Sequence, residues 1–281
     1  DHTALEKYEE LKNILIRKKN IILQGPPGVG KTFMAKRLAY SMTGWKDDER
    51  IRLVQFHQNY TYEDFVMGYK PDGDGFKLKE GIFYKFCKKA AGDPDRKYFF
   101  IIDEINRGNI SKIFGELLML IEKEYRGEKI TMGYTGKEFS VPENLYIIGM
   151  MNTADRSLAM LDYALRRRFS FFDVKPGFDS EGFKIHQDRL ENRHFNGVIK
   201  ELKKLNDEIR KDPLLGPGFC IGHSYFCDCT PEKCTDEWIR SVLDYDIFPM
   251  LKEYWIDDED DRRFKNWKKS FKDVFEQTEK S

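Results

Sequence analysis

Apolar residues along this chain form short unbroken runs that alternate with more polar stretches. Five runs, bounded by glycine or charged residues, have the length and composition of buried strands: residues 20–24, 51–57, 97–104, 144–152 and 169–174. We expect helices in four stretches around them: residues 4–18, 31–42, 110–124 and 156–168. Strands that are apolar throughout and alternate with helices are typical of a parallel sheet covered on both faces. The pattern therefore predicts an α/β fold.

The pattern changes near residue 177. Upstream, a turn rich in glycine and aspartate at residues 72–75 interrupts a mostly helical stretch. Downstream, strands fade and helical stretches dominate, such as residues 198–210 and 238–254. We therefore expect a large α/β domain over residues 1–177 and a small, mainly helical domain over residues 178–281.

The segment GPPGVGKT follows a predicted strand, begins a predicted helix and fits the pattern G-x-x-x-x-G-K-[ST]. Such a loop wraps backbone N–H groups around phosphate oxygens, which Cβ atoms would obstruct, and the next helix directs its N-terminus at the anion. Lys31 is expected to reach the β- and γ-phosphates, and Thr32 to ligate Mg²⁺. A glycine-rich turn without a ligand is the alternative, but the flanking strand and helix favour a nucleotide site. The expected nucleotide contacts are Gly25, Pro26, Gly28, Val29, Gly30, Lys31, Thr32 and Phe33.

Two carboxylates end the apolar run FFIIDE. They should lie at the carboxyl end of a central strand, beside the phosphate loop. Asp103 would hold Mg²⁺ through water, which makes Thr32 and Asp103 the expected metal ligands, and Glu104 would polarise the attacking water as general base. Two solvated acids at a strand end would be the simpler interpretation if there were no phosphate loop nearby.

Asn152 ends the next predicted strand, within the segment MNTAD. In a phosphate-loop sheet that strand lies between the strand of the loop and the strand of Asp103. The Asn152 side chain should therefore face the terminal phosphate rather than the base, and position the water together with Glu104. Asp155 and Arg156 lie just beyond, where they could organise the boundary with a neighbouring subunit.

The segment LDYALRRRF carries three consecutive arginines beside a buried aromatic strand, which is costly unless they meet anions. If subunits form a ring, Arg167 and Arg168 can reach the terminal phosphate held by a neighbour, a contact worth ~10³–10⁵ in rate. A solvated basic helix end, favoured by the helix dipole, is the alternative.

Composition narrows the setting. The 48 basic and 48 acidic residues cancel, so no global basic field indicates nucleic acid, although a local patch stays open. No run of 18 apolar residues occurs and the charged start is not a secretory signal, so we expect no membrane span. An odd count of five cysteines without a signal peptide favours the cytoplasm. Four of them match no common zinc-finger spacing, which favours buried or incidental thiols over a metal site: Cys220, Cys227, Cys229 and Cys234.

Taken together, these motifs resemble the core of an AAA+ ATPase, in the order phosphate loop, IIDEINR, strand-borne asparagine and LDYALRRRF. More narrowly, MNTADRSLAMLDYALRRRFSF resembles the signature of the McrB family, the motor subunits of modification-dependent restriction systems. VQFHQNYTYEDFVMGYKP, GIFYKFC, VPENLYIIG and GHSYF are similar to that family as well. The likeness is dense from about residue 21 to residue 178 and patchy beyond. It implies an AAA+ P-loop NTPase whose second domain is a helical lid.

The resemblance also implies a function. It suggests GTP with Mg²⁺, a homo-hexamer, an McrC-type endonuclease subunit as partner, and DNA translocation driven by GTP turnover. It assigns hydrolysis to Asp103, Glu104, Asn152 and Asp155, with Arg156 and Arg167 acting at the interface. Inserts near residues 72–79 and 128–140 fall where this branch carries pore or partner hairpins. The family's domain that recognises modified DNA is expected to lie outside this chain.

The sequence leaves open which nucleobase the site selects and which activity the nucleotide turnover drives. The residues alone predict a nucleoside triphosphatase without selecting guanine. Candidates for base contacts are the segment before Asn20 and His223, for which a structural hydrogen bond is equally expected. The alternative function is an MoxR-like AAA+ ATPase that remodels proteins, against which the MNTADRS stretch argues. A nucleotide-binding scaffold without hydrolysis is a third alternative. It is disfavoured because all four expected site residues are present: Lys31, Asp103, Glu104 and Asn152.

Overall fold

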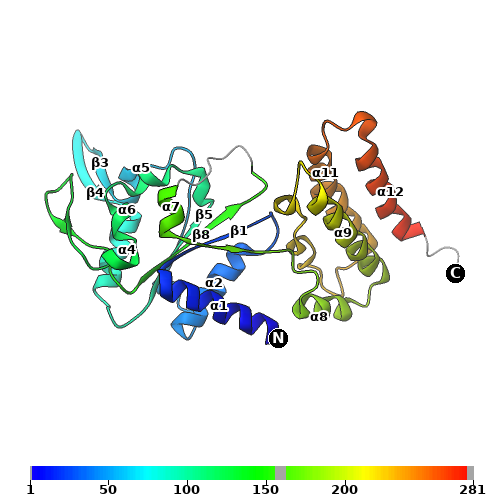
Figure 1. Ribbon diagram of the computed structural model, residues 1–281, viewed down its shortest axis with the longest axis horizontal. Helices are drawn as coiled ribbons and strands as arrows, with labels where there is room; N and C mark the ends of the chain where they lie inside the picture. Colours follow the sequence, from blue (N-terminus) through cyan, green and yellow to red (C-terminus); the bar gives the residue numbers. More distant parts are fainter. Residues whose placement is uncertain (1, 156–162, 277–281) are drawn as a thin grey trace. The chain divides into compact units, whose positions relative to one another are not determined.

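The computed structural model describes residues 2–155 and 163–276. Backbone proximity divides the chain into two compact units, an α/β unit and a helical unit (Figure 1). The α/β unit comprises residues 5–24 and 31–173. The helical unit comprises residues 25–30 and 174 onward, with the first few residues of the chain. The phosphate-loop residues 25–30 therefore belong with the helical unit by their contacts.

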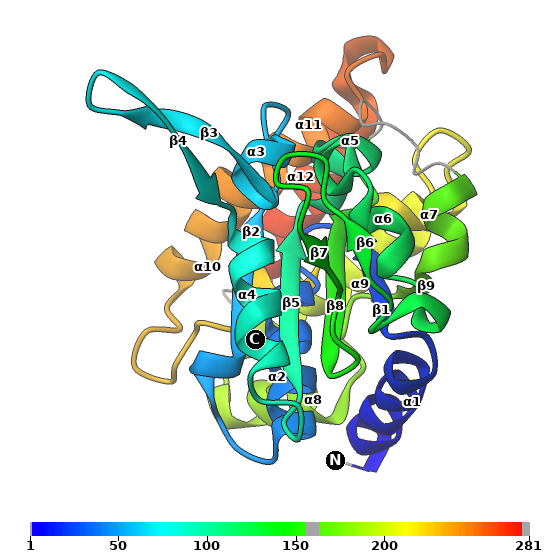
Figure 2. The ribbon, with the colours of Figure 1, turned by 90° about the vertical axis from the view of Figure 1, so that its left-hand side faces the viewer.

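Five strands form the sheet of the α/β unit, in the order β2-β5-β8-β1-β9 (Figure 2). The pairs β2–β5, β5–β8 and β1–β9 are parallel, as predicted. The strand of Asn152 lies between the strand that enters the phosphate loop and the strand of Asp103, which confirms the expected order and brings three carboxyl ends to one edge. The strands are β1 (Asn20–Gly25), β2 (Ile51–Gln55), β5 (Tyr98–Asp103), β8 (Leu145–Asn152) and β9 (Ser170–Asp173).

Helices cover the sheet because successive strand residues point to opposite faces. Phe100, Ile102 and Ile147 are fully buried on one face, in a core shared with α4, α5 and α6. On the other face α2 packs against β5 and β8 through buried apolar residues. The helices of this unit are α1 (His2–Lys18), α2 (Lys31–Thr43), α3 (Tyr62–Phe65), α4 (Ile82–Ala91), α5 (Ile110–Phe114), α6 (Leu117–Leu120) and α7 (Tyr163–Arg168).

Two segments differ from the sequence prediction. The turn near residues 72–75 does not interrupt a helix but joins two antiparallel strands, β3 (Met67–Asp72) and β4 (Gly75–Glu80). The predicted helix over residues 110–124 is broken at Gly115, whose φ of 53° ends α5. The expected hairpin around residues 134–136 is confirmed, with the short strands β6 (Ile130–Thr131) and β7 (Glu138–Phe139).

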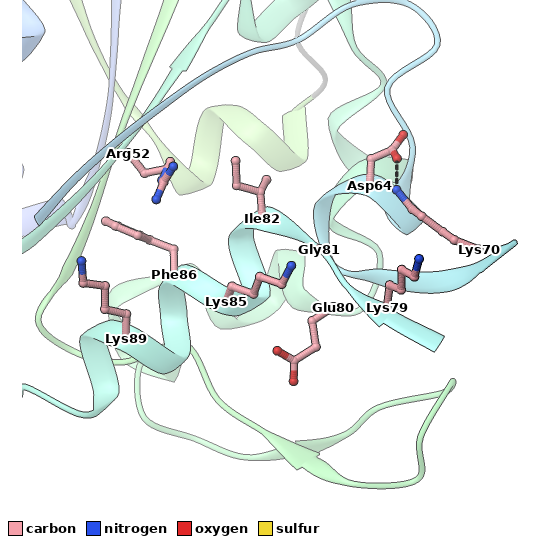
Figure 3. A pocket seen from close by; sticks show the side chains of 10 residues that line it. All are labelled: Arg52, Asp64, Lys70, Lys79, Glu80, Gly81, Ile82, Lys85, Phe86 and Lys89. Atoms are coloured by element: carbon pink, nitrogen blue, oxygen red, sulfur yellow. Dashed lines mark hydrogen bonds and ion pairs between the residues drawn. The ribbon is translucent and has the colours of Figure 1, made fainter. Parts of the chain in front are cut away.

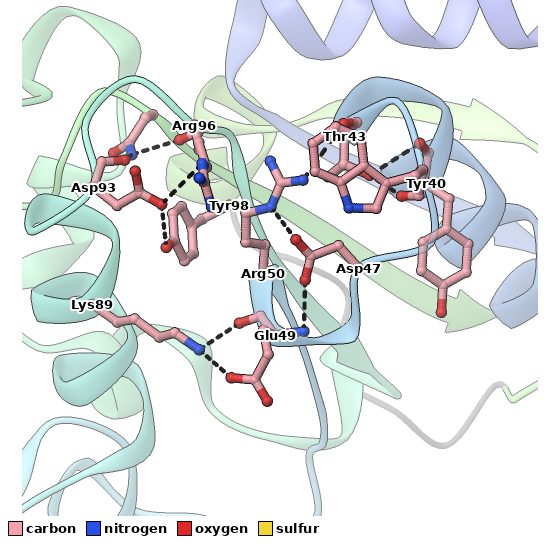
Figure 4. A network of polar contacts seen from close by, with 11 residues as sticks. Tyr40, Thr43, Asp47, Glu49, Arg50, Lys89, Asp93, Arg96 and Tyr98 are labelled. Atoms are coloured by element: carbon pink, nitrogen blue, oxygen red, sulfur yellow. Dashed lines mark hydrogen bonds and ion pairs between the residues drawn. The ribbon is translucent and has the colours of Figure 1, made fainter.

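A polar network ties the end of α2 to the outer part of the sheet (Figure 4). Arg50 is buried, donates to Asp47 at 2.7 Å and lies over the Trp45 ring, with 5.0 Å to the ring centroid. Beside it, Lys89 of α4 donates to Glu49 at 2.6 Å. These contacts fix the connection that leads into β2.

A second buried arginine lies at the starts of β1 and β8. Arg126 donates to the Ile121 and Leu145 carbonyls and to Asn20 Oδ1, at 3.0, 3.1 and 2.7 Å. Asn20 is fully buried and its amide donates to the Ile121 and Arg168 carbonyls. Asn20 therefore has a structural role at the start of β1, with its side chain directed into the protein.

The helical unit surrounds a core of its own. The predicted helix over residues 198–210 is confirmed within α9, and that over residues 238–254 is formed by α10 and α11 joined by a turn of π-helix, Leu243–Ile247. Within residues 2–155 and 163–276, each helix is too short or too polar to span a lipid bilayer. The helices are α8 (Glu181–Leu190), α9 (Arg193–Lys211), α10 (Asp236–Val242), α11 (Phe248–Tyr254) and α12 (Arg262–Glu276).

The cysteines of this unit are free thiols. Cys220, Cys229 and Cys234 are buried in the helical core, and Cys227 is exposed. Burial raises the pKa of the Cys220 and Cys229 thiols. In the part of the chain that the structure describes, no three Cys, His, Asp or Glu side chains lie together as a metal site would require.

Candidate active site

The phosphate loop runs from the end of β1 to the start of α2. Gly28 and Gly30 have φ values of 73° and 78°, left-handed conformations that glycine adopts without strain. The Gly28 carbonyl accepts a hydrogen bond from the Ser224 backbone N–H at 2.8 Å. Gly222 packs so closely that a Cβ there would lie 2.0 Å from the Gly28 carbonyl. The segment around Ser224 therefore holds the outer side of the loop.

At the start of α2, Lys31 begins a chain of side-chain hydrogen bonds. Its Nζ donates to Asn152 Oδ1 at 2.6 Å, and Asn152 Nδ2 donates to Glu104 Oε1, also at 2.6 Å. Burial lowers the pKa of Lys31 to about 8, against the opposing effect of Glu104 and Asp103. The three side chains that the sequence assigned to phosphate binding, sensing and general-base catalysis are thus in direct contact at the carboxyl edge of the sheet.

The general-base candidate sits on a strained backbone. Glu104 follows β5 with a φ of 50°, which is uncommon for a residue with a Cβ and concentrates at functional sites. Its backbone N–H donates to Asp103 Oδ1 at 3.0 Å. Glu104 Oε2 is buried and accepts no hydrogen bond within the described chain. This oxygen can therefore accept a hydrogen bond from a water molecule.

The donor set at this edge fits Mg²⁺. The Thr32 hydroxyl at the start of α2 and the Asp103 carboxylate at the end of β5 are hard oxygen ligands of the kind Mg²⁺ takes together with phosphates and water. When bound, the ion would neutralise charge on the phosphates. Phe33, also expected near the nucleotide, is 63% exposed on α2.

Arg107 was not among the predicted site residues, and the structure adds it. Its Nη2 donates to Asp155 Oδ2 at 2.9 Å, and its Nε lies 3.2 Å from Glu104 Oε2 in an ion pair without hydrogen-bond geometry. One guanidinium thus joins the general-base candidate to the MNTAD segment. The signal in the sequence was a cation three residues after Glu104, but its second partner lies 48 residues away.

The two arginines expected to act on a neighbour differ in their surroundings. Arg168 is 16% exposed, donates to the Leu118 carbonyl at 2.8 Å and lies 3.0 Å from Glu122. Arg167 is 75% exposed, with Glu122 at 3.6 Å. Arg168 is therefore anchored by contacts within the α/β unit, while the Arg167 side chain is largely exposed. Arg156 lies outside the described residues.

His223 has a structural contact in the helical unit. Its Nδ1 accepts the Gly177 backbone N–H at 2.9 Å, and its ring packs edge-on against Phe178 and Phe183. This contact ties the start of the helical unit to the segment that holds the phosphate loop. Of the two roles weighed for His223, the structural hydrogen bond is present.

A glycine-bearing phosphate loop, a lysine joined through an asparagine to a strand-end glutamate, and a five-stranded parallel sheet define a P-loop nucleoside triphosphatase. Residues 20–169 match the family model for the AAA domain (dynein-related subfamily), and residues 197–263 match that for the McrB alpha-helical lid domain. The chain therefore belongs to the AAA family and carries a lid of the McrB type. It is an AAA+ enzyme of the kind that hydrolyses nucleoside triphosphates.

Two curated relatives of the chain are components of restriction enzymes. The chain is 54% identical over 88% of its length to the type IV methyl-directed restriction enzyme EcoKMcrB subunit of Escherichia coli, and spans 56% of that protein. It is 28% identical over 89% of its length to the type II restriction enzyme BsuMI component YdiS of Bacillus subtilis, of which it spans 82%. The chain is thus a homologue of McrB that spans little more than half of the E. coli subunit.

Proposed function

We propose that this chain is a GTP-hydrolysing motor that assembles as a homo-hexamer, works with an McrC-type endonuclease subunit and couples GTP turnover to DNA translocation in modification-dependent restriction. The observation that carries hydrolysis is the contact chain from Lys31 through Asn152 to Glu104. The restriction setting rests on the likeness to the E. coli subunit and on the lid of the McrB type.

Each side chain of the proposed site has a separate role in hydrolysis. The phosphate loop and the Lys31 ammonium bind the triphosphate, and Lys31 must leave Asn152 Oδ1 to do so. Glu104 accepts the proton of the attacking water through Oε2, which accepts no hydrogen bond in the described chain. Asn152 holds the other carboxylate oxygen and thereby fixes the orientation of the base. Arg167, which is exposed, supplies positive charge to the terminal phosphate of a neighbour.

A Glu104→Gln variant tests the base assignment. It should bind triphosphate like the wild type and lose turnover by ~10²–10⁴-fold, because the amide keeps the contact with Asn152 but cannot take a proton. Nucleotide affinity by isothermal titration and phosphate release at saturating nucleotide separate the two effects. Normal turnover of the variant in the presence of its partner subunit would show that another group is the base.

The preference for guanine or adenine nucleotides is tested by a separate measurement. Turnover of GTP and ATP should be compared side by side across protein concentration, with particle size followed in parallel. GTP preference together with activity that rises as larger particles form is the expected result. A preference for ATP would remove the restriction-motor proposal and favour the alternative, an AAA+ ATPase of the MoxR type that remodels proteins.

A further inference from the structure

A basic hollow of about 520 Å³ lies in the α/β unit, away from the nucleotide site (Figure 3). It is lined by the edge strand β2, the short helix α3, the ends of the β3–β4 hairpin and the helix α4. In Figure 3, Lys85 and Lys89 project from α4, and Arg52 approaches from β2. The basic residues of its lining are Arg52, Lys70, Lys79, Lys85 and Lys89.

Two of these cations, Arg52 and Lys85, form no ion pair within the part of the chain that the structure describes. The carboxylates in the hollow are already paired, Asp64 with Lys70 at 2.6 Å and Glu80 with Lys88 at 2.8 Å. Arg52 and Lys85 are both exposed, whereas Lys79 forms an ion pair with Asp72 at 3.8 Å, outside the hollow. Because the whole chain has as many acidic as basic residues, this excess is local.

The two faces of the β3–β4 hairpin beside the hollow carry different kinds of side chain. Its register places Tyr69 opposite Leu78, so both lie on one face, while Lys70 lies directly opposite Lys77 on the other. Like charges opposite each other destabilise a strand pair. A polyanion lying along this face would turn that cost into an attraction. The lysine face continues into the hollow through Lys70 and Lys79.

We infer that this hollow is a contact site for the phosphate backbone of DNA. This inference rests on the proposed translocation function and names residues that hold its substrate. The site presents long, exposed cations and few directional polar groups, so it recognises repeated charge rather than sequence. Charge contacts independent of sequence are what a motor needs to move along a duplex. An acidic protein segment is the rival ligand, and the test below distinguishes it.

The test removes Arg52 and Lys85 together as Arg52→Ala/Lys85→Ala. The control, Lys265→Ala/Lys269→Ala, removes two exposed cations from α12 and so matches the change in net charge. The probe is a short, fluorescently labelled duplex without modified bases, titrated by anisotropy from about 50 to about 200 mM salt, with and without triphosphate. Triphosphate turnover without DNA should be unchanged in both variants, since neither touches the nucleotide site.

Salt dependence decides the outcome. Two lost phosphate contacts should reduce the slope of log K against log salt by about 1.8. Duplex binding by the wild type should therefore weaken about 12-fold more over this fourfold salt range than binding by Arg52→Ala/Lys85→Ala. The control should keep the wild-type slope. Equal slopes for the two variants, with duplex binding intact, would overturn the site but leave translocation standing.

Two other results have separate meanings. If the wild type binds no duplex at low salt in the presence of triphosphate, the proposed DNA translocation fails, and the site fails with it. If a polyglutamate peptide binds in a manner that depends on Arg52 and Lys85 while the duplex does not, the hollow serves an acidic protein partner and the DNA assignment is overturned.

Discussion

The contact between Gly222 and the phosphate loop gives the sharpest prediction. Gly222 has an ordinary extended backbone, with φ of −77°, so a side chain there causes no backbone strain. The obstacle is space, because an added Cβ would lie 2.0 Å from the Gly28 carbonyl and 2.6 Å from the Pro27 oxygen. Both neighbours are backbone atoms of the loop, so Gly222→Ala must push the loop or the segment that holds it.

The cost can be worked from these contacts. Overpacking of this kind costs about 1–3 kcal/mol. Loss of the 2.8 Å hydrogen bond from the Ser224 N–H to the Gly28 carbonyl adds about 0.5–1.5 kcal/mol. Displacing the loop should also weaken charge-assisted bonds to phosphate, each worth about 1.5–3 kcal/mol, which corresponds to roughly a 10- to 100-fold rise in the Kd for triphosphate.

Gly182→Ala is the matched control. Gly182 lies in α8, and a Cβ there would meet nothing within 4 Å. Alanine should stabilise that helix by about 0.5–1 kcal/mol and leave the Kd unchanged. Thermal unfolding and isothermal titration with triphosphate measure both quantities. A wild-type Tm and Kd for Gly222→Ala would refute the argument, and a lowered Tm with an unchanged Kd would show that the contact does not set the loop's binding geometry.

Three further outcomes are expected. Arg107→Ala should keep triphosphate binding and lower kcat about tenfold, because Glu104 and Asp155 lose their common cation; Asp155→Asn should do the same, and the double variant should be no worse than either in phosphate-release assays. Arg167→Ala should bind nucleotide but lose assembled turnover, and mixing it with Lys31→Ala should restore activity if the arginine acts across subunits. Lys31→Met should raise the free energy of unfolding of the nucleotide-free protein at pH 7 by about 1–3 kcal/mol. The reason is that the pKa of Lys31 in the folded protein is about 8, below the usual 10.5, so the charged ammonium destabilises the fold. That cost is complete below pH 8 and disappears as the pH rises to 10.5, so unfolding curves of the two proteins should converge there; a constant difference across this range would assign the effect to packing.

Much of the site could be predicted because it depends on strand ends. Parallel strands bring their carboxyl ends to one edge, so Asp103, Glu104 and Asn152 had to lie near the end of β1 once β8 was placed between β1 and β5. The contact of Arg107 with both Glu104 and Asp155 was harder to predict, because Asp155 is distant from Arg107 in sequence. The role of Gly222 was also hidden, since nothing local distinguishes a close backbone approach from an ordinary turn.

The hairpin and the broken helix show two different limits. Residues 67–80 alternate apolar and polar side chains around an Asp-Gly turn, so a period of two was present in the sequence, and the neighbouring helical stretches masked it. Residues 110–124 keep helical spacing on both sides of Gly115, and only its left-handed φ, set by the tertiary structure, separates α5 from α6. Local pattern predicts the element type more reliably than its continuity.

We expect an isolated subunit to turn over slowly, because the proposed mechanism takes one arginine from a neighbouring subunit. Glu104 Oε1 accepts from Asn152, Oε2 faces Arg107, and Asn152 Oδ1 is held by Lys31. Both carboxylate oxygens of the proposed general base therefore face donor groups of the protein. A triphosphate competes for Lys31 and so releases one member of the chain. Arg168 is anchored to Glu122. We therefore propose that charge on the far side of the phosphate comes from a neighbouring subunit, through the exposed Arg167.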